Sequence, residues 1–554
     1  MRCSNGSMSS TNRAPAASHA GRPAGKSPLS VQSENGSVTT GAASYRYRNP
    51  ILPGCHPDPS ICRVGDYYYL VTSTFEYLPG LPIHRSTNLV DWVPIGHAIH
   101  RPGQLDLSGI PSSKGLYAPT IRHHDGTFYV VCTVVSPVVD GEPSWPGRAG
   151  HFVVTATEPE GPWSEPTWFE GFDGIDPSLT FDGDRVWLCG NRLAQPGLWP
   201  GQTDIWLTEL DPATLAPIGE VREIWRGASA RAVWAEGPHI IARPGGGWML
   251  VAAEGGTNRN HAVCVAYADD IAGPYVGDPG NPRLTHRDLG DRVPIADVGH
   301  ADLVEAPDGR WWSTMLGIQT IDGENGLLGR QTHLVPVEWE HRQPLFAPGS
   351  GRVEPAMAAE GVPDQQPAPT EYRDDFDAPV LDPAWTAPRI LPDTFADTVA
   401  RPGYVRLTAT PTEPSGLGPL AFLGRRLPDH RTHAAARIEL AGAVRGGLLL
   451  RTSESAYLEL TVDRRGVGRA VLADDGVEMT VGEVSGIHTE GIDLAIDVDG
   501  LTARLTIGDT HLGEVDLRPL ASGRPSMFVG SWIGVMAVGD GVVDVDHVTL
   551  RVAP

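Results

Sequence analysis

With 554 residues the chain is too long for one compact core, so at least two domains are expected. Glycine (65 residues) and proline (50 residues) are abundant, which disfavours long helices and favours many short strands joined by turns. A formal net charge of −24 at pH 7 argues against nucleic acid or an anionic membrane as a partner, because phosphate groups would be repelled.

The first 47 residues are rich in Ser, Gly, Ala and Asn and contain no apolar run of the length that a secretory signal needs. We therefore predict a disordered leader over residues 1–47 and a cytoplasmic protein. No apolar span long enough to cross a membrane follows the leader.

The cysteines lack the paired CxxC spacing of zinc sites, and their low density argues against a disulfide framework. Cys132 in "FYVVCTVV" and Cys264 in "HAVCVAYA" lie within apolar runs typical of strands, whereas Cys55 and Cys62 flank the segment "CHPDPSIC". We predict that these four cysteines are small packing residues.

One pattern recurs five times after the leader: a Pro or His, a short apolar step, a turn, and an aromatic-rich strand. Its anchor positions lie 60, 58, 61 and 62 residues apart, at Pro59, Pro119, Pro177, Pro238 and His300. Each period has room for four strands, and no helical pattern of 10–15 residues separates them, which disfavours a parallel α/β fold. The sequence therefore predicts an all-β chain with a five-bladed β-propeller over residues 48–348.

The residues just before the anchors should meet at one face of this propeller, because the first strand of each blade lines the central axis. These positions supply three carboxylates from separate blades, Asp58, Asp176 and Glu236, together with Tyr117 from blade two. Carboxylates that share a pocket shift one another's pKa values, so one can stay protonated while another stays ionised. Hydrolysis of a glycosidic bond needs such a pair, although each residue alone could be a turn, a cap or a structural ion pair.

Other residues near the expected pocket allow two interpretations each. His300 occupies the anchor of blade five, where it is a structural group or helps to hold a hard cation or to contact a sugar. Phe75 and Tyr77 follow the outgoing strand of blade one in "TSTFEYLPG", and they either pack on a sugar ring or belong to the core between blades.

An ordered series of motifs closely resembles glycoside hydrolase family 43, in particular its two-domain β-xylosidases and α-L-arabinofuranosidases. The series covers residues 48–348 and comprises "NPILPGCHPDPSICRVGDYYYLVTSTFEYLPGLPIHRSTNLVDW", "GIDPSL", "AEGPHI", "AEGGTNRNHA", "GHADLVEAPDGRWW" and "LLGRQTHLVPVEW". The resemblance implies a five-bladed propeller and an inverting enzyme that acts on glycans containing arabinose or xylose. It also implies that no cofactor is required for the chemistry.

When the residue roles of the family are carried over motif by motif, the resemblance implies that Asp58 is the general base and Glu236 the general acid. Asp176 would tune and orient the acid. In the pocket Phe75 would pack against the sugar, and Arg330 would hydrogen-bond its hydroxyl groups.

The resemblance gives three further residues weaker roles. Thr257 in "AEGGT" would line the sugar site, and Tyr117 stands where the family usually has a tryptophan. His300 corresponds to an axial histidine that lies beside a calcium ion or a water cluster in several members, so the resemblance allows a structural Ca²⁺ there.

Residues 349–371 are rich in Pro, Ala and Gln, and this composition predicts a linker. Residues 372–554 show period-two alternation with frequent turns, which indicates a β-sandwich. The resemblance implies a concanavalin-like sandwich with a loop that reaches the mouth of the active site. Trp532 in "GSWIGVMA" is the candidate for that lip, or else a buried residue of the sandwich.

The expected function is that of an inverting exo-glycosidase that releases terminal xylose from β-1,4-xylo-oligosaccharides. An α-L-arabinofuranosidase or a bifunctional enzyme is the alternative. An endo-arabinanase is disfavoured by the sandwich lip, and a non-catalytic carbohydrate-binding propeller by the presence of all three carboxylates. The expected partner is a small oligosaccharide, without nucleic acid or membrane, and the sequence leaves a homo-oligomer open.

Overall fold

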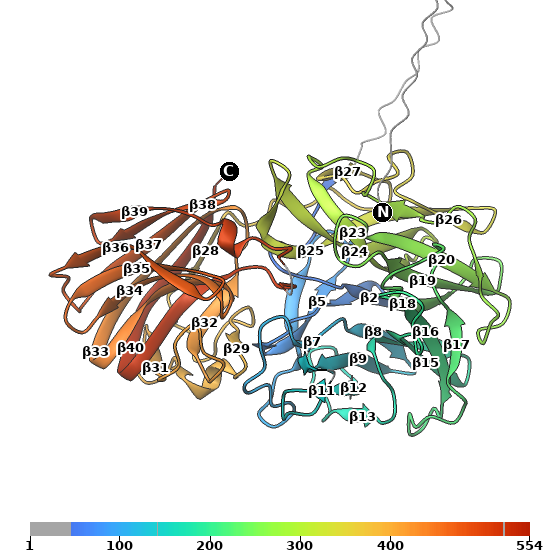
Figure 1. Ribbon diagram of the computed structural model, residues 1–554, viewed down its shortest axis with the longest axis horizontal. Coiled ribbons are helices and arrows are strands. Elements are labelled where there is room, and N and C mark those ends of the chain that lie inside the picture. The colour runs from blue at the N-terminus through green and yellow to red at the C-terminus, as the bar shows by residue number, and fades with distance from the viewer. Residues whose placement is uncertain (1–45, 141, 525–526, 554) are drawn as a thin grey trace, which may run out of the picture. The chain divides into compact units, whose positions relative to one another are not determined.

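The computed structural model describes residues 46–140, 142–524 and 527–553 (Figure 1). Its regular structure consists of strands β1 to β40 and two single-turn 3-10 helices, η1 (Pro392–Thr394) and η2 (Arg518–Leu520). The predicted all-β class is confirmed. Neither of these helices has the length and apolarity that crossing a membrane requires.

The first part of the chain forms five successive antiparallel sheets, each of which is one blade. Blade one comprises β2 (Ser60–Val64), β3 (Tyr67–Val71), β5 (Gly80–Ser86) and β6 (Val93–Ile99). Blade two comprises β8 (Thr120–His124), β9 (Thr127–Val135), β12 (Gly150–Ala156) and β13 (Thr167–Phe169). Blade three comprises β14 (Ile175–Asp182), β15 (Arg185–Leu193), β16 (Thr203–Leu210) and β17 (Arg222–Trp225). Blade four comprises β18 (Glu236–Ala242), β19 (Trp248–Glu254), β20 (Ala262–Ala268) and β21 (Val276–Gly277). Blade five comprises β23 (Ile295–Glu305), β24 (Trp311–Ile321), β25 (Glu324–Glu340) and β26 (Gln343–Phe346).

Short strands extend two of these blades: β7 (Gly115–Leu116) pairs with β9, and β22 (Leu284–Thr285) pairs with β20. β10 (Val138–Val139) and β11 (Glu142–Pro143) form a separate two-stranded sheet. The innermost strands β2, β8, β14, β18 and β23 contact one another in sequence, and β23 contacts β2, so the ring is closed. The five-bladed propeller predicted from the repeat is confirmed.

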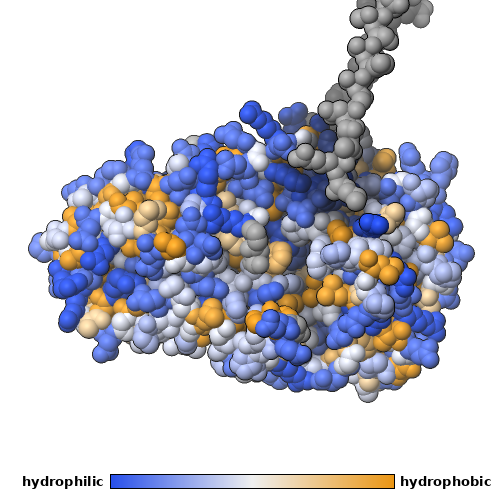
Figure 2. Space-filling model, viewed as in Figure 1, coloured by the Kyte–Doolittle hydropathy of each residue, from blue (hydrophilic) through white to orange (hydrophobic). Residues whose placement is uncertain are grey.

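The second strand of every blade is packed between its neighbours and reads as an apolar run. One completely buried side chain in each of these five strands shows this: Val71, Val130, Leu188, Val251 and Met315. The visible face of the molecule is mostly hydrophilic, with hydrophobic residues scattered among the polar ones (Figure 2).

The two ends of the propeller segment are tied together. β1 (Arg46–Arg48) pairs with β27 (Ala356–Ala358), and residues 51–56 run along β25, where Ile51 N donates to Thr332 O at 2.9 Å and His56 N donates to Arg330 O at 3.0 Å. The predicted leader lies outside the described residues except for Arg46 and Tyr47, and β27 falls within the segment 349–371 expected as a linker.

The rest of the chain forms the sandwich, whose two longest strands, β33 (Arg431–Ser453) and β40 (Trp532–Val552), pair along most of their length. The first part of β33 pairs with β37 and its last part with β34, so the long strands are shared by both layers. The remaining strands are β28 (Glu371–Asp374), β29 (Ala387–Pro388), β30 (Ala396–Asp397), β31 (Val405–Thr408), β32 (Ala421–Arg426), β34 (Ala456–Asp463), β35 (Val467–Asp474), β36 (Val477–Ser485), β37 (Ile492–Asp499), β38 (Thr502–Ile507) and β39 (Thr510–Asp516). Leu448, Leu458, Ile496 and Leu505 are completely buried between the layers, which confirms the predicted β-sandwich.

Propeller and sandwich join along the segment that leaves β3. There β4 (Tyr77–Leu78) pairs with β29, and the Tyr77 ring stacks on the Trp532 ring at a centroid distance of 4.0 Å and an interplanar angle of 7°. Both rings are at most 1% exposed. Such a stack contributes about 0.5–1.5 kcal/mol beyond the burial of its area.

A fully buried ion pair lies beside this stack. Arg451 Nη1 of β33 is 3.2 Å from Glu76 Oε1, and neither side chain has any exposed surface. The same guanidinium donates to Tyr77 Oη at 3.0 Å and to Ser112 Oγ at 3.0 Å. Each charge depends on the other, because neither can be solvated by water at this position.

Replacing Arg451 with Ala should therefore destabilise the protein by about 3–5 kcal/mol, because the Glu76 carboxylate is left buried without its cation. Thermal unfolding followed by circular dichroism measures the loss. Arg469→Ala is the matched control, because the Arg469–Glu483 pair is about half exposed and should contribute at most about 1 kcal/mol. Equal shifts of the two melting temperatures would show that the buried ion pair contributes no more to stability than the exposed one.

Candidate active site

Asp58 lies at the start of blade one, two residues before β2 begins, and both of its carboxylate oxygens accept hydrogen bonds. Ser73 Oγ donates to Oδ2 at 2.5 Å, and Arg330 Nη1 donates to Oδ1 at 2.6 Å. The side chain is only 4% exposed. This carboxylate is therefore held as the acceptor of two hydrogen bonds, one of them donated by a guanidinium.

A left-handed backbone recurs at the residue before the anchor proline in three blades. Its φ is 54° at Asp58, 57° at Asp176 and 59° at Gly237. In blades one and three this strained position carries the carboxylate itself. In blade four glycine occupies it, and the carboxylate of Glu236 lies one residue earlier.

Glycine is required at position 237 for a second reason. A Cβ atom there would lie 2.8 Å from Cε1 of His300 and 2.9 Å from its Nδ1. The backbone of the acid segment therefore passes directly over the imidazole ring, and any side chain would displace one of the two.

Asp176 and Glu236 form an electrostatically linked pair. Gly237 N donates to Asp176 Oδ2 at 3.0 Å, which fixes the backbone beside Glu236. Burial raises the pKa of Asp176 to about 6, with His300 opposing and Asp58 adding to the shift. Burial, followed by the negative charges of Asp176 and Asp58, raises the pKa of Glu236 well above its usual range. Glu236 can thus carry a proton near neutral pH and donate it.

An aromatic wall flanks the carboxylates, and Arg330 lies within it. The Phe75 ring lies 5.3 Å from the Tyr117 ring and 6.5 Å from the Phe528 ring, almost parallel to the latter at 16°. Arg330 Cζ lies 5.3 Å from the Phe75 centroid and 5.5 Å from that of Phe528, and Arg330 Nε donates to Phe528 O at 3.2 Å. The structure therefore brings Phe75, Tyr117 and Arg330 together with Asp58.

Phe528 belongs to the sandwich domain, and sequence reasoning missed it. It lies four residues before Trp532 in the same segment. The structure corrects Trp532 and Tyr77 as sugar-binding residues, because each covers the other in the domain junction described above. For Trp532 the alternative stated above, a buried residue of the sandwich, is the one that the structure bears out. A cavity of about 740 Å³ between the domains has Phe528, Lys114 and Glu454 in its lining.

Thr257 and His300 are the remaining residues that the sequence predicts for the site. Within the described residues Thr257 forms no side-chain hydrogen bond, and its role stays a prediction. His300 is 6% exposed, and its ring lies 6.4 Å from that of His239.

The carboxylates near His300 supply few of the six to eight oxygen ligands that a calcium ion prefers. Of the nearby carboxylates, Asp176 binds the Gly237 N–H and Asp302 is paired with Arg122. In residues 46–140, 142–524 and 527–553 no group of three or more His, Cys, Asp and Glu side chains could hold a metal ion. No step of the chemistry is assigned to a metal.

The five described cysteines are free and buried, as predicted for the four considered above. Cys55 Sγ accepts a hydrogen bond from Gly530 N at 3.1 Å, so it packs against the sandwich segment that carries Phe528.

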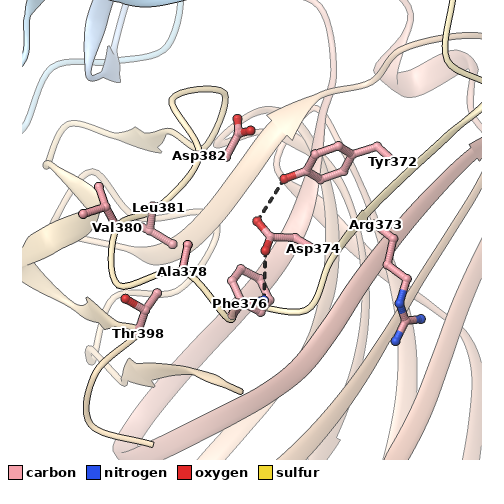
Figure 3. A pocket seen from close by; sticks show the side chains of 9 residues that line it. All are labelled: Tyr372, Arg373, Asp374, Phe376, Ala378, Val380, Leu381, Asp382 and Thr398. Carbon is pink, nitrogen blue, oxygen red and sulfur yellow. Dashed lines mark hydrogen bonds between the residues drawn. The ribbon is translucent and has the colours of Figure 1, made fainter. Parts of the chain in front are cut away.

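A smaller pocket of about 320 Å³ lies on the sandwich, and Figure 3 shows the residues that line it. Asp374 accepts hydrogen bonds from Tyr372 Oη and Phe376 N, both at 2.9 Å, so its carboxylate is satisfied by its own neighbours (Figure 3). None of the predicted site residues lines this pocket.

Comparison with known families identifies both parts of the chain. The family model of glycosyl hydrolases family 43 matches residues 47–343, and that of a β-xylosidase C-terminal concanavalin A-like domain matches residues 373–551. The second match confirms that the sandwich is concanavalin-like.

Two relatives are similar over nearly the whole chain. A xylosidase/arabinosidase of Butyrivibrio fibrisolvens is 34% identical, covering 89% of this chain and 96% of its own length. A non-reducing end α-L-arabinofuranosidase of Bacteroides ovatus is 35% identical, covering 90% of this chain and 92% of its own.

Among solved structures, Bacteroides ovatus Xyloglucan PUL GH43B superposes with a TM-score of 0.82 at 32% identity, covering 92% of this chain and 100% of its own. A xylan β-1,4-xylosidase from Bacillus halodurans reaches a TM-score of 0.82 at 28% identity, covering 91% of this chain and 100% of its own.

Gly237→Ala should disturb the carboxylate site, because the new methyl group meets the His300 ring and the left-handed backbone becomes strained. Gly183→Ala is the matched control: Gly183 has a φ of 58°, and nothing lies within 4 Å of the Cβ position. We expect a clearly larger drop in melting temperature for Gly237→Ala, together with a displaced His300 in its crystal structure. Equal drops, with His300 in place, would refute the close contact.

Proposed function

The chain belongs to glycosyl hydrolase family 43, and we propose that it is an exo-acting enzyme that releases terminal xylose from β-1,4-xylo-oligosaccharides. It is a glycoside hydrolase of an inverting family. The observation that carries the proposal is the contrast between two carboxylates in one site. Asp58 is held as a hydrogen-bond acceptor by Arg330 and Ser73, whereas burial and the neighbouring negative charges raise the pKa of Glu236 well above its usual range.

This contrast suits a single displacement. Glu236 donates its proton to the glycosidic oxygen as the bond to the anomeric carbon breaks. Asp58 accepts a proton from a water molecule that attacks the same carbon from the opposite face, so the anomeric configuration inverts. Proton exchange with solvent then restores both groups. Family 43 enzymes generally need no cofactor for catalysis, and these steps use side chains alone.

Asp176 acts on the acid rather than on the substrate. Its hydrogen bond from Gly237 N holds the acid segment, and its charge disfavours ionisation of Glu236. The two carboxyl groups therefore titrate as a linked pair.

The aromatic wall supports exo action on a single terminal sugar. Phe75 and Phe528 hold the Arg330 guanidinium between them, with donors left to bind sugar hydroxyl groups. Because Phe528 comes from the sandwich, the second domain limits one side of the pocket. A bounded pocket favours a chain end, whereas an endo-acting enzyme needs an open cleft.

Terminal α-L-arabinofuranose is the second candidate substrate, alone or beside xylose. The relatives named above favour it, since one is a non-reducing end α-L-arabinofuranosidase and the other a xylosidase/arabinosidase. Both sugars are pentoses, and the acid, the base and the attacking water would have the same roles.

A substrate panel tests the proposal: xylobiose, nitrophenyl β-D-xyloside and nitrophenyl α-L-arabinofuranoside, with the first anomer released recorded by NMR. We expect α-xylose from the β-xylosides and a slower release of arabinose. Glu236→Gln should lower turnover of xylobiose by about 10²–10⁴-fold but that of the nitrophenyl glycosides less, because nitrophenolate leaves without a proton. Release of β-xylose from the β-xylosides, or unchanged xylobiose turnover by Glu236→Gln, would refute the mechanism.

Asp176→Asn should shift the alkaline limb of the pH profile of kcat/KM to lower pH. This limb reports loss of the proton from the acid, and removing the Asp176 charge favours ionised Glu236, so the pKa of Glu236 falls. Asp297→Asn is the matched control, because Asp297 is also buried and left-handed, with a φ of 57°, but its charge does not act on Glu236. An alkaline limb that stays in place in Asp176→Asn would show that Asp176 does not tune the acid.

A further inference from the structure

The proposed chemistry leaves one conspicuous side chain beside the acid without a role. Trp234 lies two residues before Glu236 and is 41% exposed, and among the tryptophans that the structure describes it alone is exposed. Its φ of 52° is left-handed, a conformation that is strained for a bulky residue. Strain of this kind persists where surrounding contacts enforce it, and it is common at functional sites.

Trp234 lies at the same face of the propeller as the carboxylates. β18 begins at Glu236, and its antiparallel partner β19 ends at Glu254, since Glu236 is paired with Ala253. β16 begins at this face as well, because Thr203 Oγ1 donates to Ala235 O at 2.9 Å. The residues that follow β19 and precede β16 therefore surround the start of the acid strand.

Two glycines from these loops pack against the indole ring of Trp234. A Cβ atom on Gly256 would lie 2.9 Å from Cδ1 of Trp234, and one on Gly201 would lie 3.3 Å from its Nε1. Trp234 N also donates to Gly201 O at 2.8 Å. The pyrrole edge of the ring is thus held against backbone on two sides, while two-fifths of the residue stays open to solvent.

Hydrogen bonds also hold the backbone of residues 228–232, the segment before Trp234, in place. The buried Glu254 carboxylate accepts hydrogen bonds from Ala228 N at 2.8 Å and from Ser229 N at 3.0 Å. Trp199 Nε1 donates to Ala232 O at 2.7 Å. The exposed ring is therefore presented by a loop whose backbone is already ordered, and binding to it costs little conformational entropy.

The position of the acid decides what this ring can contact. Glu236 protonates the oxygen that joins the terminal sugar to the rest of the substrate, so the leaving part must lie on the side of Glu236. Phe75, Tyr117 and Phe528 form the wall on the side of blades one and two. We propose that Trp234 binds the leaving sugar, whose apolar ring face stacks on the exposed indole.

This inference rests on the proposed function and makes it more specific. It assigns a binding site for a pyranose leaving unit, as in a β-linked xylan fragment, and it makes Trp234 a determinant of preference for oligosaccharides over simple alkyl glycosides. An aromatic ring supplies such contact at low entropic cost because only two side-chain torsions are fixed.

The test compares kcat/KM for xylobiose with kcat/KM for methyl β-D-xyloside, two substrates that share the terminal sugar and both need the acid. We expect Trp234→Leu and Trp234→Ala to lower the ratio about tenfold, and Trp234→Phe to keep most of it. Tyr67→Ala is the control: Tyr67 is 43% exposed at the other end of the blade strands, and its removal should leave both rates unchanged. Melting temperatures verify that each variant is folded.

The outcomes separate the inference from the proposed function. If the wild type releases arabinose instead of xylose, the ratio is measured with α-L-arabinofuranosyl-xylobiose and methyl α-L-arabinofuranoside, so that the leaving unit is still a pyranose. A wild type that hydrolyses neither pair refutes the proposed function. An active wild type whose ratio is unchanged in Trp234→Leu, or falls equally in Trp234→Phe, overturns the role of the indole.

Discussion

The buried contact between Arg330 and Asp58 is the constraint on which the site depends. It joins residues 272 positions apart, from the last blade and the entrance to the first, at 2.6 Å. The same guanidinium also holds Phe528 O of the sandwich, a further 198 positions along the chain. A charge buried this deeply is tolerated only when its partners are fixed, so ring closure and domain docking are both conditions for a stable active site.

The repeated blades supply one backbone template that is used in three chemical ways. The left-handed residue before the anchor proline points Asp58 and Asp176 into the pocket, one bonded to a guanidinium and the other to a backbone N–H. In blade four Gly237 takes that position, and Glu236 starts β18. A symmetric fold thereby produces an asymmetric set of carboxylates, and this asymmetry allows an acid and a base to coexist.

The sandwich contributes to the pocket from two directions. Phe528 adds a wall directly, while Arg451 fixes Glu76, the residue that follows Phe75. Because Phe75 itself is 1% exposed and has a φ of 53°, its position depends on this support. The second domain is therefore part of the active site and cannot be regarded as an appendage.

The sequence by itself determined the elements whose signals are local. The spacing of the anchors, the turn residues and the alternation of apolar residues predicted the propeller and the sandwich, and the three carboxylates lie at the expected phase of the repeat. Only the tertiary structure decided which aromatic residues face the pocket. Trp532 and Tyr77 cover each other in the junction, whereas Phe528 lies beside Phe75. The physical reason is that a repeat fixes the direction of a side chain within its own blade, whereas a contact between domains depends on packing between residues hundreds of positions apart.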